Sequence, residues 1–455
     1  MPNRLGRLLP VLFFLCNAMP AIADDPPAAV ISPPAPPAPP APPAPPAPPA
    51  HSDDAIAAEN SGLRDVLKAM READTRALFD LYHSKDEIVH AIAAMAIERS
   101  RFNLDAASRD AKVCEDSLFK TKPAIAFTCA QFQAGDLRLA GQWQAALDAE
   151  TDMARRYKGL GRGIDRALAS TQKYLDGEAG VPQFSVDPPP ATDTVLKLKH
   201  DPRNDESRRP FLEARANGHD LDLLFDTGAT DMILGEDKAR DLGVKLLDAH
   251  GHISGWISKG IETQRGLLDT LQLGPITLRN VPVTVTAHRN ALIGGNLLAP
   301  LGALRITEKE LTVYAAPSTP PSCERDMQIG SDVHGRSFRL LPEFLVNDQP
   351  HRVMLDTGAA YFLIGSKAAL DEVTKIRRGR LAINDVGGSH PFASAEAAKV
   401  EMQIDRQPFN IYFIVYTEST MPYDITLGAN ALRDMDFILD FRQHRLCFPM
   451  HEHLH

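Results

Sequence analysis

This 455-residue sequence has few of the features that mark several large classes of protein. Acidic residues outnumber basic ones by 59 to 49, and no basic cluster with interleaved aromatic residues occurs, so no nucleic-acid partner is predicted. No run of about 18 apolar residues occurs anywhere, so no membrane-spanning helix is predicted either. The spacings typical of zinc ligands and of a serine hydrolase triad are both missing. We therefore expect no metal and no other cofactor.

The first 23 residues have the pattern of a secretory signal peptide. Arg4 and Arg7 supply positive charge, an apolar stretch covers Leu8 to Met19, and Ala21 to Ala23 offer small residues for cleavage. The apolar stretch is too short to span a bilayer. The pattern predicts a soluble, exported protein, located in a bacterial periplasm or secreted.

Cysteine is scarce, which limits the disulfides that the exported chain can form. Cleavage after Ala23 would leave four cysteines, an even number that permits two disulfides in an oxidising compartment. These are Cys114, Cys129, Cys323 and Cys447. One disulfide in each folded unit is the simplest pairing, and buried free thiols are the alternative.

Residues 24–52 are rich in proline and alanine, with repeated Pro-Pro-Ala units from Pro33 to Pro49. Such a stretch forms no hydrogen-bonded ladder and buries no core, and it favours extended polyproline II. We predict a disordered linker that acts as a spacer.

Glycine and proline are scarce between residues 53 and 180, where alanine is abundant and apolar residues recur at helical spacing. This pattern predicts an all-α region. Two similar stretches begin at Leu104 and Trp143, 39 positions apart (143 − 104), and the second resembles a tetratricopeptide helix pair. That resemblance implies a surface for a protein partner. A generic helical bundle is the alternative.

From Thr194 onward, short alternating segments and turn signals replace the helical pattern and predict all-β structure. A loop from Ala316 to Cys323 divides this part into two lobes, 194–316 and 323–450. The phrase "DTGATDMILG" begins at Asp226, and "DTGAAYFLIG" begins at Asp356, 130 positions later (356 − 226).

The match between the two lobes extends on both sides of this phrase. Upstream, Asn217 corresponds to Asn347 within a predicted hairpin, whose returning strand ends at the aspartate. Downstream, "ALIGGNLL" corresponds to "DITLGANAL", which aligns Gly294 with Gly428. Two equivalent lobes imply a pseudo-twofold axis, and a loop near that axis would meet its own copy.

The chemistry of a shared pair of carboxyl groups follows from this symmetry. Two carboxyl groups about 3 Å apart cannot both ionise, so Asp226 and Asp356 would hold one proton between them. The charged member could then accept a proton from water while the protonated member donates to a carbonyl oxygen. The predicted supporting residues, which turn the backbone or bond across the axis, are Thr227, Gly228, Thr357 and Gly358.

The two lobes resemble aspartic proteases of the retropepsin-like kind, and "ALIGGNLLAPLG" is especially similar to a segment of retroviral proteases. The resemblance implies a bilobal acid-protease fold in which Asp226 and Asp356 form the catalytic dyad of an endopeptidase that cleaves polypeptides. Because one chain supplies both lobes, we expect the monomer to be active.

The same resemblance implies a hairpin flap in each lobe that covers the substrate and excludes water. His252–Glu262 and Ile383–Phe392 have the required position and flexible glycines. The substrate-binding candidates at the two tips are Gly255, Trp256, Gly387 and Gly388. Trp256 is expected to close over the substrate, and ordinary packing beneath the hairpin is the alternative.

Ala229 and Ala359 stand where pepsin-like enzymes usually carry serine or threonine. A hydroxyl group there could stabilise the charged carboxylate, and its absence predicts an activity optimum less acidic than that of pepsin.

Two other functions are alternatives to peptide hydrolysis. An aspartyl phosphotransfer loop needs a second acidic residue two positions on for Mg²⁺, where this chain has Gly228 and Gly358. The stronger alternative is a non-catalytic exported scaffold that binds peptides with the helical region and a protease-like fold.

Overall fold

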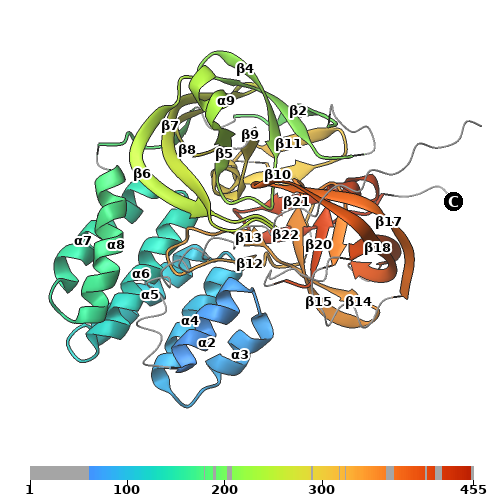
Figure 1. Ribbon diagram of the computed structural model, residues 1–455. Coiled ribbons are helices and arrows are strands. Elements are labelled where there is room, and N and C mark those ends of the chain that lie inside the picture. Colours follow the sequence, from blue (N-terminus) through green and yellow to red (C-terminus); the bar gives the residue numbers. More distant parts are fainter. Residues whose placement is uncertain are drawn as a thin grey trace, which may run out of the picture. The chain divides into compact units, whose positions relative to one another are not determined.

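The chain begins with helices and continues with strands (Figure 1). The computed structural model describes residues 61–178, 180–187, 191–201, 207–287, 291–316, 318–322, 324–364, 374–404, 407–415 and 423–451. The predicted signal peptide, the predicted linker and Cys323 lie outside the described residues. None of the helices within these ranges is long and apolar enough to cross a membrane.

Seven helices occupy the described part of the predicted all-α region. They are α2 (Ser61–Arg71), α3 (Thr75–Tyr82), α4 (Glu87–Ser100), α5 (Leu104–Leu118), α6 (Pro123–Leu139), α7 (Trp143–Tyr157) and α8 (Arg162–Glu178). Side chains fix several of their starts: Asp74 accepts a hydrogen bond from the Ala77 amide, and Asp86 accepts one from the Ile88 amide, each at 2.9 Å. Pro123 is the first residue of α6, where its missing N–H costs no helical bond.

The two similar sequence stretches form α5 and α7, and each is followed by a second helix, α6 or α8. A disulfide between Cys114 and Cys129 joins α5 to α6. Aromatic residues from successive helices pack together, as where Tyr157 of α7 contacts Phe127 of α6 at 5.3 Å between ring centroids. The helical region is thus confirmed, and its tetratricopeptide character stays a prediction.

The strands form two large sheets, one around each copy of the repeated phrase. The larger has the order β22-β21-β10-β11-β2-β3-β4-β9-β5-β8-β7-β6, with β1 paired to β8. Its strands from the first half are β1 (Ser185–Asp187), β2 (Thr194–Lys199), β3 (Phe211–Ala216), β4 (His219–Phe225), β5 (Met232–Gly235), β6 (Lys245–Ile253), β7 (Ile261–Leu273), β8 (Ile276–Thr286), β9 (Ala291–Ile293), β10 (Ala303–Ile306) and β11 (Glu310–Tyr314). Two short helices, α9 (Glu236–Asp241) and α10 (Gly295–Leu298), follow β5 and β9.

The second sheet has the order β14-β15-β20-β16-β19-β18-β17. Its strands are β14 (Glu343–Val346), β15 (Gln349–Asp356), β16 (Phe362–Ile364), β17 (Thr374–Asp385), β18 (Gly388–Ile404), β19 (Gln407–Val415) and β20 (Ile425–Gly428). Between the two halves, β12 (Ile329–Gly330) pairs with β13 (Arg339–Leu340). The order of helices first and strands second agrees with the pattern of the sequence.

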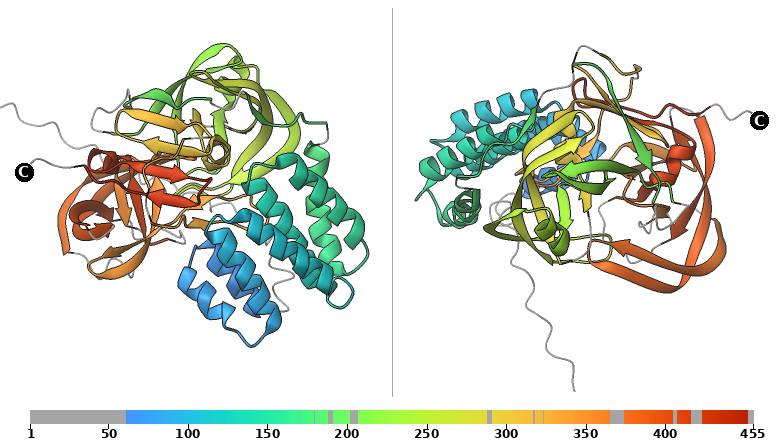
Figure 2. Two further views of the ribbon diagram at one scale, coloured as in Figure 1. Left: turned by 180° about the vertical axis from the view of Figure 1, so that it is seen from behind. Right: turned by 90° about the horizontal axis from the view of Figure 1, so that it is seen from above.

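The two sheets do not divide at the loop from Ala316 to Cys323, where the sequence predicted the division between the two lobes. Strands β21 (Phe437–Asp440) and β22 (Arg445–Cys447) belong to the second half of the sequence but extend the first sheet. β21 pairs antiparallel with β10, which places Leu304 opposite Leu439, and Figure 2 shows these strands side by side. The C-terminal strands therefore tie the two halves together through backbone hydrogen bonds.

The sequence repeat is also a repeat of structure. β3 and β4 form a hairpin, as do β14 and β15, and the turn residues Asn217 and Asn347 both adopt a φ of 48°. Asparagine tolerates this left-handed conformation better than most residues. The returning strand then pairs in parallel with a later strand in each half, β4 with β9 and β15 with β20.

The helical region is fastened to the segment that connects the two halves. The Arg99 guanidinium is fully buried and donates to the carbonyl oxygens of Asp332 at 2.9 Å and Val333 at 3.1 Å. It also pairs with Asp136 at 2.6 Å. Val333 packs within the apolar core of the helices. The connecting segment thus forms part of the helical core.

Candidate active site

Asp226 and Asp356 meet where the two halves of the β region come together. Asp226 directly follows β4, and Asp356 ends β15. Their carboxyl groups hydrogen-bond to each other. A Cβ atom on Gly228 would lie 2.5 Å from Cγ of Asp356, and one on Gly358 would collide with Asp226 in the same way. Glycine is therefore required at both positions for the carboxyl groups to approach.

Thr227 and Thr357 lock the two loops to each other. The Thr227 hydroxyl donates to the Leu355 carbonyl at 2.9 Å, and the Thr357 hydroxyl donates to the Phe225 carbonyl at 2.6 Å. Each hydroxyl also accepts a hydrogen bond of 3.1 Å from the backbone amide of the other threonine. Both residues are buried, so this reciprocal set of bonds is shielded from water. It holds the two carboxyl groups in register.

The second repeated element supports each loop from the other side. The Gly295 amide donates to the Ala229 carbonyl at 2.9 Å, and the Ala429 amide donates to the Ala359 carbonyl at 2.7 Å. Gly294 and Gly428 lie so close to these loops that a side chain would strike the backbone. In each half, the apolar strand that ends in glycine thus supports the loop that follows the aspartate.

The two carboxyl groups differ in their electrostatic surroundings although both are buried, at 9% and 8% exposure. Burial raises the pKa of Asp226, opposed by hydrogen bonds from the Gly228 amide, from Asp356 and from the Ala229 amide. Burial also raises the pKa of Asp356, and the charge of Asp226 raises it further. Both carboxyl groups are thus harder to ionise than an ordinary aspartate, and Asp356 more so, which favours a single proton on the pair.

The two predicted flap tips lie against each other. The first tip lies between β6 and β7, and the second is the turn between β17 and β18. Gly255 of the first tip lies against the Asp385 side chain, and Gly387 of the second lies against the Ser258 side chain. Gly388 has a φ of 121°, a conformation that favours glycine. Three of the four candidates thus shape this contact directly or through the turn.

Trp256, the fourth candidate, packs against Tyr423 with 5.8 Å between ring centroids in an edge-to-face arrangement. It also contacts Ile383 of β17. Tyr423 is only 2% exposed; burial raises its pKa, the Arg339 charge lowers it, and the Asp356 charge raises it. Trp256 therefore packs against residues of the second half of the chain. Closure of Trp256 over a substrate stays a prediction.

Three residues of the site and the predicted flaps were not indicated by the sequence: Arg209, Tyr423 and Asp385. Arg209 pairs with the buried carboxylate of Asp201. Burial lowers the pKa of Arg209, and the charges of Asp226 and Asp356 oppose that shift. The offset of 130 that relates the two aspartates also relates Arg209 to Arg339 (339 − 209), so the repeat itself could have indicated these arginines. Nothing local to Tyr423 or Asp385 indicates their position.

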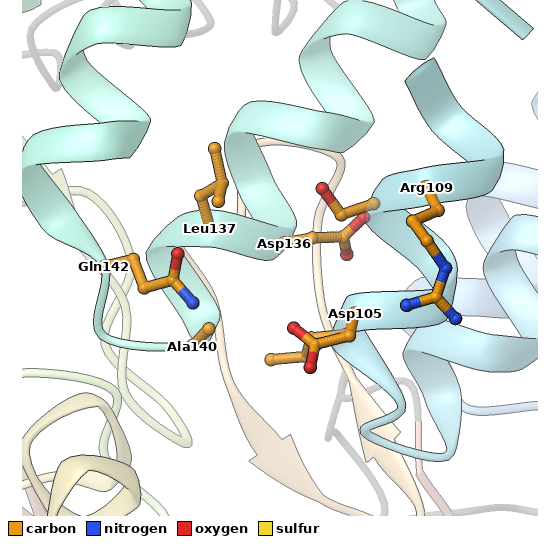
Figure 3. Close-up of a pocket in the computed structure, with 8 residues that line it drawn as sticks. Asp105, Arg109, Asp136, Leu137, Ala140 and Gln142 are labelled. Atoms are coloured by element: carbon orange, nitrogen blue, oxygen red, sulfur yellow. The ribbon is translucent and has the colours of Figure 1, made fainter. Parts of the chain in front are cut away.

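A separate cavity of about 200 Å³ lies in the helical region between α5 and α6 (Figure 3). Its charged lining residues are Asp105, Arg109 and Asp136, of which Asp136 is paired with Arg99. The cavity shares no residue with the dyad or the flap tips. Among the described residues, no cluster of three or more His, Cys, Asp or Glu side chains could hold a metal ion.

Comparison with known proteins agrees with this geometry. Residues 212–298 match the family model described as aspartyl protease, a range that contains Asp226, the first flap and Gly294. An uncharacterized protein in the cobV 5' region of a Sinorhizobium species is 28% identical over 102 residues, which is 22% of this chain and 44% of that protein. The chain thus spans less than half the length of this relative.

Two solved structures are similar to parts of the chain. Basic 7S globulin from soybean is 10% identical with a TM-score of 0.35, and the match covers 57% of this chain and 95% of that one. A retropepsin-like aspartic protease from Rickettsia conorii is 17% identical with a TM-score of 0.21, covering 30% of this chain and 95% of that one. On the match of residues 212–298 and the motif within it, the chain carries a domain of the aspartyl protease family.

Proposed function

We propose that this protein is an aspartic endopeptidase in which Asp226 and Asp356 activate a water molecule to hydrolyse peptide bonds. The observation that carries the proposal is the close approach of two buried carboxyl groups, each with a raised pKa. The β region is proposed to be a two-lobed acid-protease fold. Each lobe supplies one carboxyl group, so the monomer is the active species and a polypeptide is the substrate.

The unequal pair supplies both a base and an acid. Ionised Asp226 accepts a proton from water as the water oxygen bonds to the carbonyl carbon of the substrate. Asp356 donates its proton to the carbonyl oxygen, which gives a neutral tetrahedral diol. The proton on Asp226 then passes to the leaving nitrogen, the C–N bond breaks, and Asp356 recovers a proton from the diol hydroxyl as the carbonyl group re-forms. Both carboxyl groups return to their starting states.

The protein also restrains this chemistry in space. Hydrogen bonds from the amides of Gly228 and Ala229, at 2.9 and 3.1 Å, fix one oxygen of Asp226. The Ala359 amide fixes Asp356 in the same way at 2.9 Å. Because these donors are backbone groups, the carboxyl groups are oriented before a substrate arrives, which lowers the cost of reaching the transition state.

We further propose that the enzyme is exported, to a bacterial periplasm or to the cell exterior. The N-terminal sequence pattern supports this. The Cys114–Cys129 disulfide and the disulfide-bonded state of Cys447 also support it, since structural disulfides persist mainly in oxidising compartments. The helical region is proposed to dock a protein partner, a role that its helix pairs allow.

A cleavage assay tests the mechanism. The wild type and the D226N variant are incubated with an unfolded protein, and fragments are followed over time. We expect D226N to cleave at least about 100-fold more slowly, because it loses the general base. The matched control is D220N, whose side chain is 93% exposed on β4 and should leave the rate unchanged. Equal cleavage by wild type and D226N would reject the mechanism, and peptide binding without cleavage would favour a scaffold.

A further inference from the structure

We propose that Asp385 is a positioning residue that fastens the two flap tips to each other. The inference rests on the proposed function, since a flap matters only if a substrate is bound beneath it. We call the set Asp385, Ile257, Ser258 and His390 the hairpin latch. Its acceptor comes from the second half of the chain, and most of its donors come from the first.

The contacts of the latch converge on one carboxylate. The amides of Ile257 and Ser258 donate to Oδ2 of Asp385 at 2.9 and 2.8 Å. The Ser258 hydroxyl donates to Oδ1 at 2.8 Å, and the Gly387 amide donates to the same atom at 2.9 Å. Nε2 of His390 lies 3.2 Å from Oδ1 and 2.9 Å from the Ser258 hydroxyl. Both carboxylate oxygens of Asp385 thus accept hydrogen bonds from the other hairpin.

Asp385 is buried as an anion, with only 6% of its side chain exposed. Burial raises the pKa of Asp385. The hydrogen bonds from the amides of Ser258 and Ile257 and from the Ser258 hydroxyl lower it by a larger total amount, so the net pKa lies below the usual value. A buried carboxylate is costly to leave without donors. Separation of the tips would require water to replace at least the three donors from the first hairpin, so the latch favours the joined arrangement.

Neither hairpin needs the latch for its own structure. β6 and β7 form their own antiparallel ladder up to Ile253 and Ile261, and β17 and β18 form theirs up to Asp385 and Gly388. The added effect of Asp385 is therefore on the position of one tip relative to the other. Apolar contacts of Ile383 with Trp256 and Ile257 lie beside the latch.

The latch adjoins the contact between Trp256 and Tyr423. Trp256 directly precedes Ile257 in the first tip, and its ring contacts Tyr423, which lies close enough to Asp356 to feel its charge. A tip released from Asp385 would no longer hold Trp256 against Tyr423. Since a flap excludes water and holds a substrate in place, we infer that the latch increases the affinity of the closed site for its substrate.

Tryptophan fluorescence tests the latch without any activity. The chain has only two tryptophans, so the variant W143F leaves Trp256 as the sole reporter. In a D226N/W143F background we expect D385A to increase the acrylamide quenching constant by about twofold or more, because the tip loosens. The control D248A removes a fully exposed carboxylate from β6 in the same hairpin and should leave the quenching constant unchanged. Unchanged quenching in D385A would overturn the proposal whether or not the protein is a protease.

Steady-state kinetics test the positioning role in the active enzyme. We expect D385A to raise KM by about tenfold or more with kcat changed by less than about threefold, because binding is weakened while the dyad is intact. S258A removes only the hydroxyl donor and should shift KM in the same direction by a smaller factor. If D385A fails to fold, S258A decides alone. A fall in kcat at unchanged KM, or no change in either variant, would contradict the proposal.

Discussion

Asp226 and Asp356 are the same residue type on equivalent loops, yet their surroundings make them chemically different. Burial raises the pKa of both, and the charge of Asp226 adds a second increase at Asp356 only. Asp226 accepts hydrogen bonds from the amides of Gly228 and Ala229, which favour its ionised form. Under the proposed mechanism, the division into base and acid follows from these differences around two nearly identical side chains.

The first prediction concerns the pH dependence of cleavage. Activity requires one proton on the pair, so kcat/KM should fall at low pH as Asp226 is protonated and at high pH as Asp356 loses its proton. Because the pKa of each carboxyl group is raised, both limbs should lie above the range of ordinary aspartates. We expect an optimum less acidic than that of pepsin. A profile of kcat/KM against pH with its maximum near about pH 2 would contradict this.

A second prediction concerns the stability cost of the dyad. An aspartate whose pKa is raised in the folded state destabilises the fold once the pH exceeds its unfolded pKa, here 3.8. D356N removes this cost and keeps an N–H donor for Asp226. We expect it to raise the free energy of unfolding by about 1–3 kcal/mol near pH 7 while abolishing cleavage. Urea titrations should show that the gain disappears near about pH 3, where the wild-type carboxyl group is protonated in both states.

At the scale of elements, the candidate active site is built from two loops, and each loop is held by a threonine of the other. Thr227 bonds to the strand that leads to Asp356, and Thr357 bonds to the strand that leads to Asp226. The short parallel pairings of β4 with β9 and of β15 with β20 hold those strands in place. Hydrogen bonds across the axis therefore link the stability of the fold to the geometry of the dyad.

The third prediction tests this link with T227V and T357V. Each change leaves a buried carbonyl group and a buried amide without a partner, so we expect each to lower the free energy of unfolding by about 1–3 kcal/mol. The double variant should lose less stability than the sum of the two single losses, because both hydroxyls bond across the same interface. The exposed Thr151 of α7 provides the control, since T151V should change stability by about 0.5 kcal/mol or less. Strict additivity in denaturant titrations would show that the two bonds act independently.

At the scale of the whole described chain, the helices and the β region are joined by buried polar contacts. Arg99 connects α4 to α6 through Asp136 and to the segment between the two halves through the Asp332 and Val333 carbonyls. Burial raises the pKa of Asp136 to about 6, and Arg99 opposes that rise. The helical region is thus positioned by an ion pair that lies far from the dyad in sequence.

The fourth prediction is that R99M destabilises the protein by about 3–5 kcal/mol at neutral pH, because Asp136 is left buried and charged without a partner. Arg99 opposes the rise in the pKa of Asp136, so its removal should raise that pKa above about 6. The part of the loss that comes from the buried charge should therefore shrink as the pH falls and be gone below about 6, where Asp136 is protonated with or without Arg99. R99M/D136N should recover part of the loss. The control is R155M, whose side chain is 77% exposed. Denaturant titrations at two pH values measure the free energy of unfolding of each variant. A loss of stability that does not depend on pH would show that packing rather than charge is responsible.

Much of the site could be inferred from local patterns. The repeated Asp-Thr-Gly phrase and the apolar strand ending in glycine lie on contiguous segments, and the match of residues 212–298 confirms the family that they indicate. The helical region was predictable because helical spacing is a local property. Other features had no local signal. Asp385 and Ser258 are 127 positions apart, Arg99 and Asp332 are 233 apart, and nothing in either neighbourhood marks the partner.

The sequence alone determined that two equivalent units would each present one aspartate beside a glycine, because duplication and turn chemistry are written in consecutive residues. Tertiary structure alone decided that burial raises the pKa of both aspartates, that β21 and β22 extend the first sheet, and that the two predicted flap tips meet at Asp385. The physical reason is that burial, charge and backbone pairing at these points depend on groups brought together only by folding.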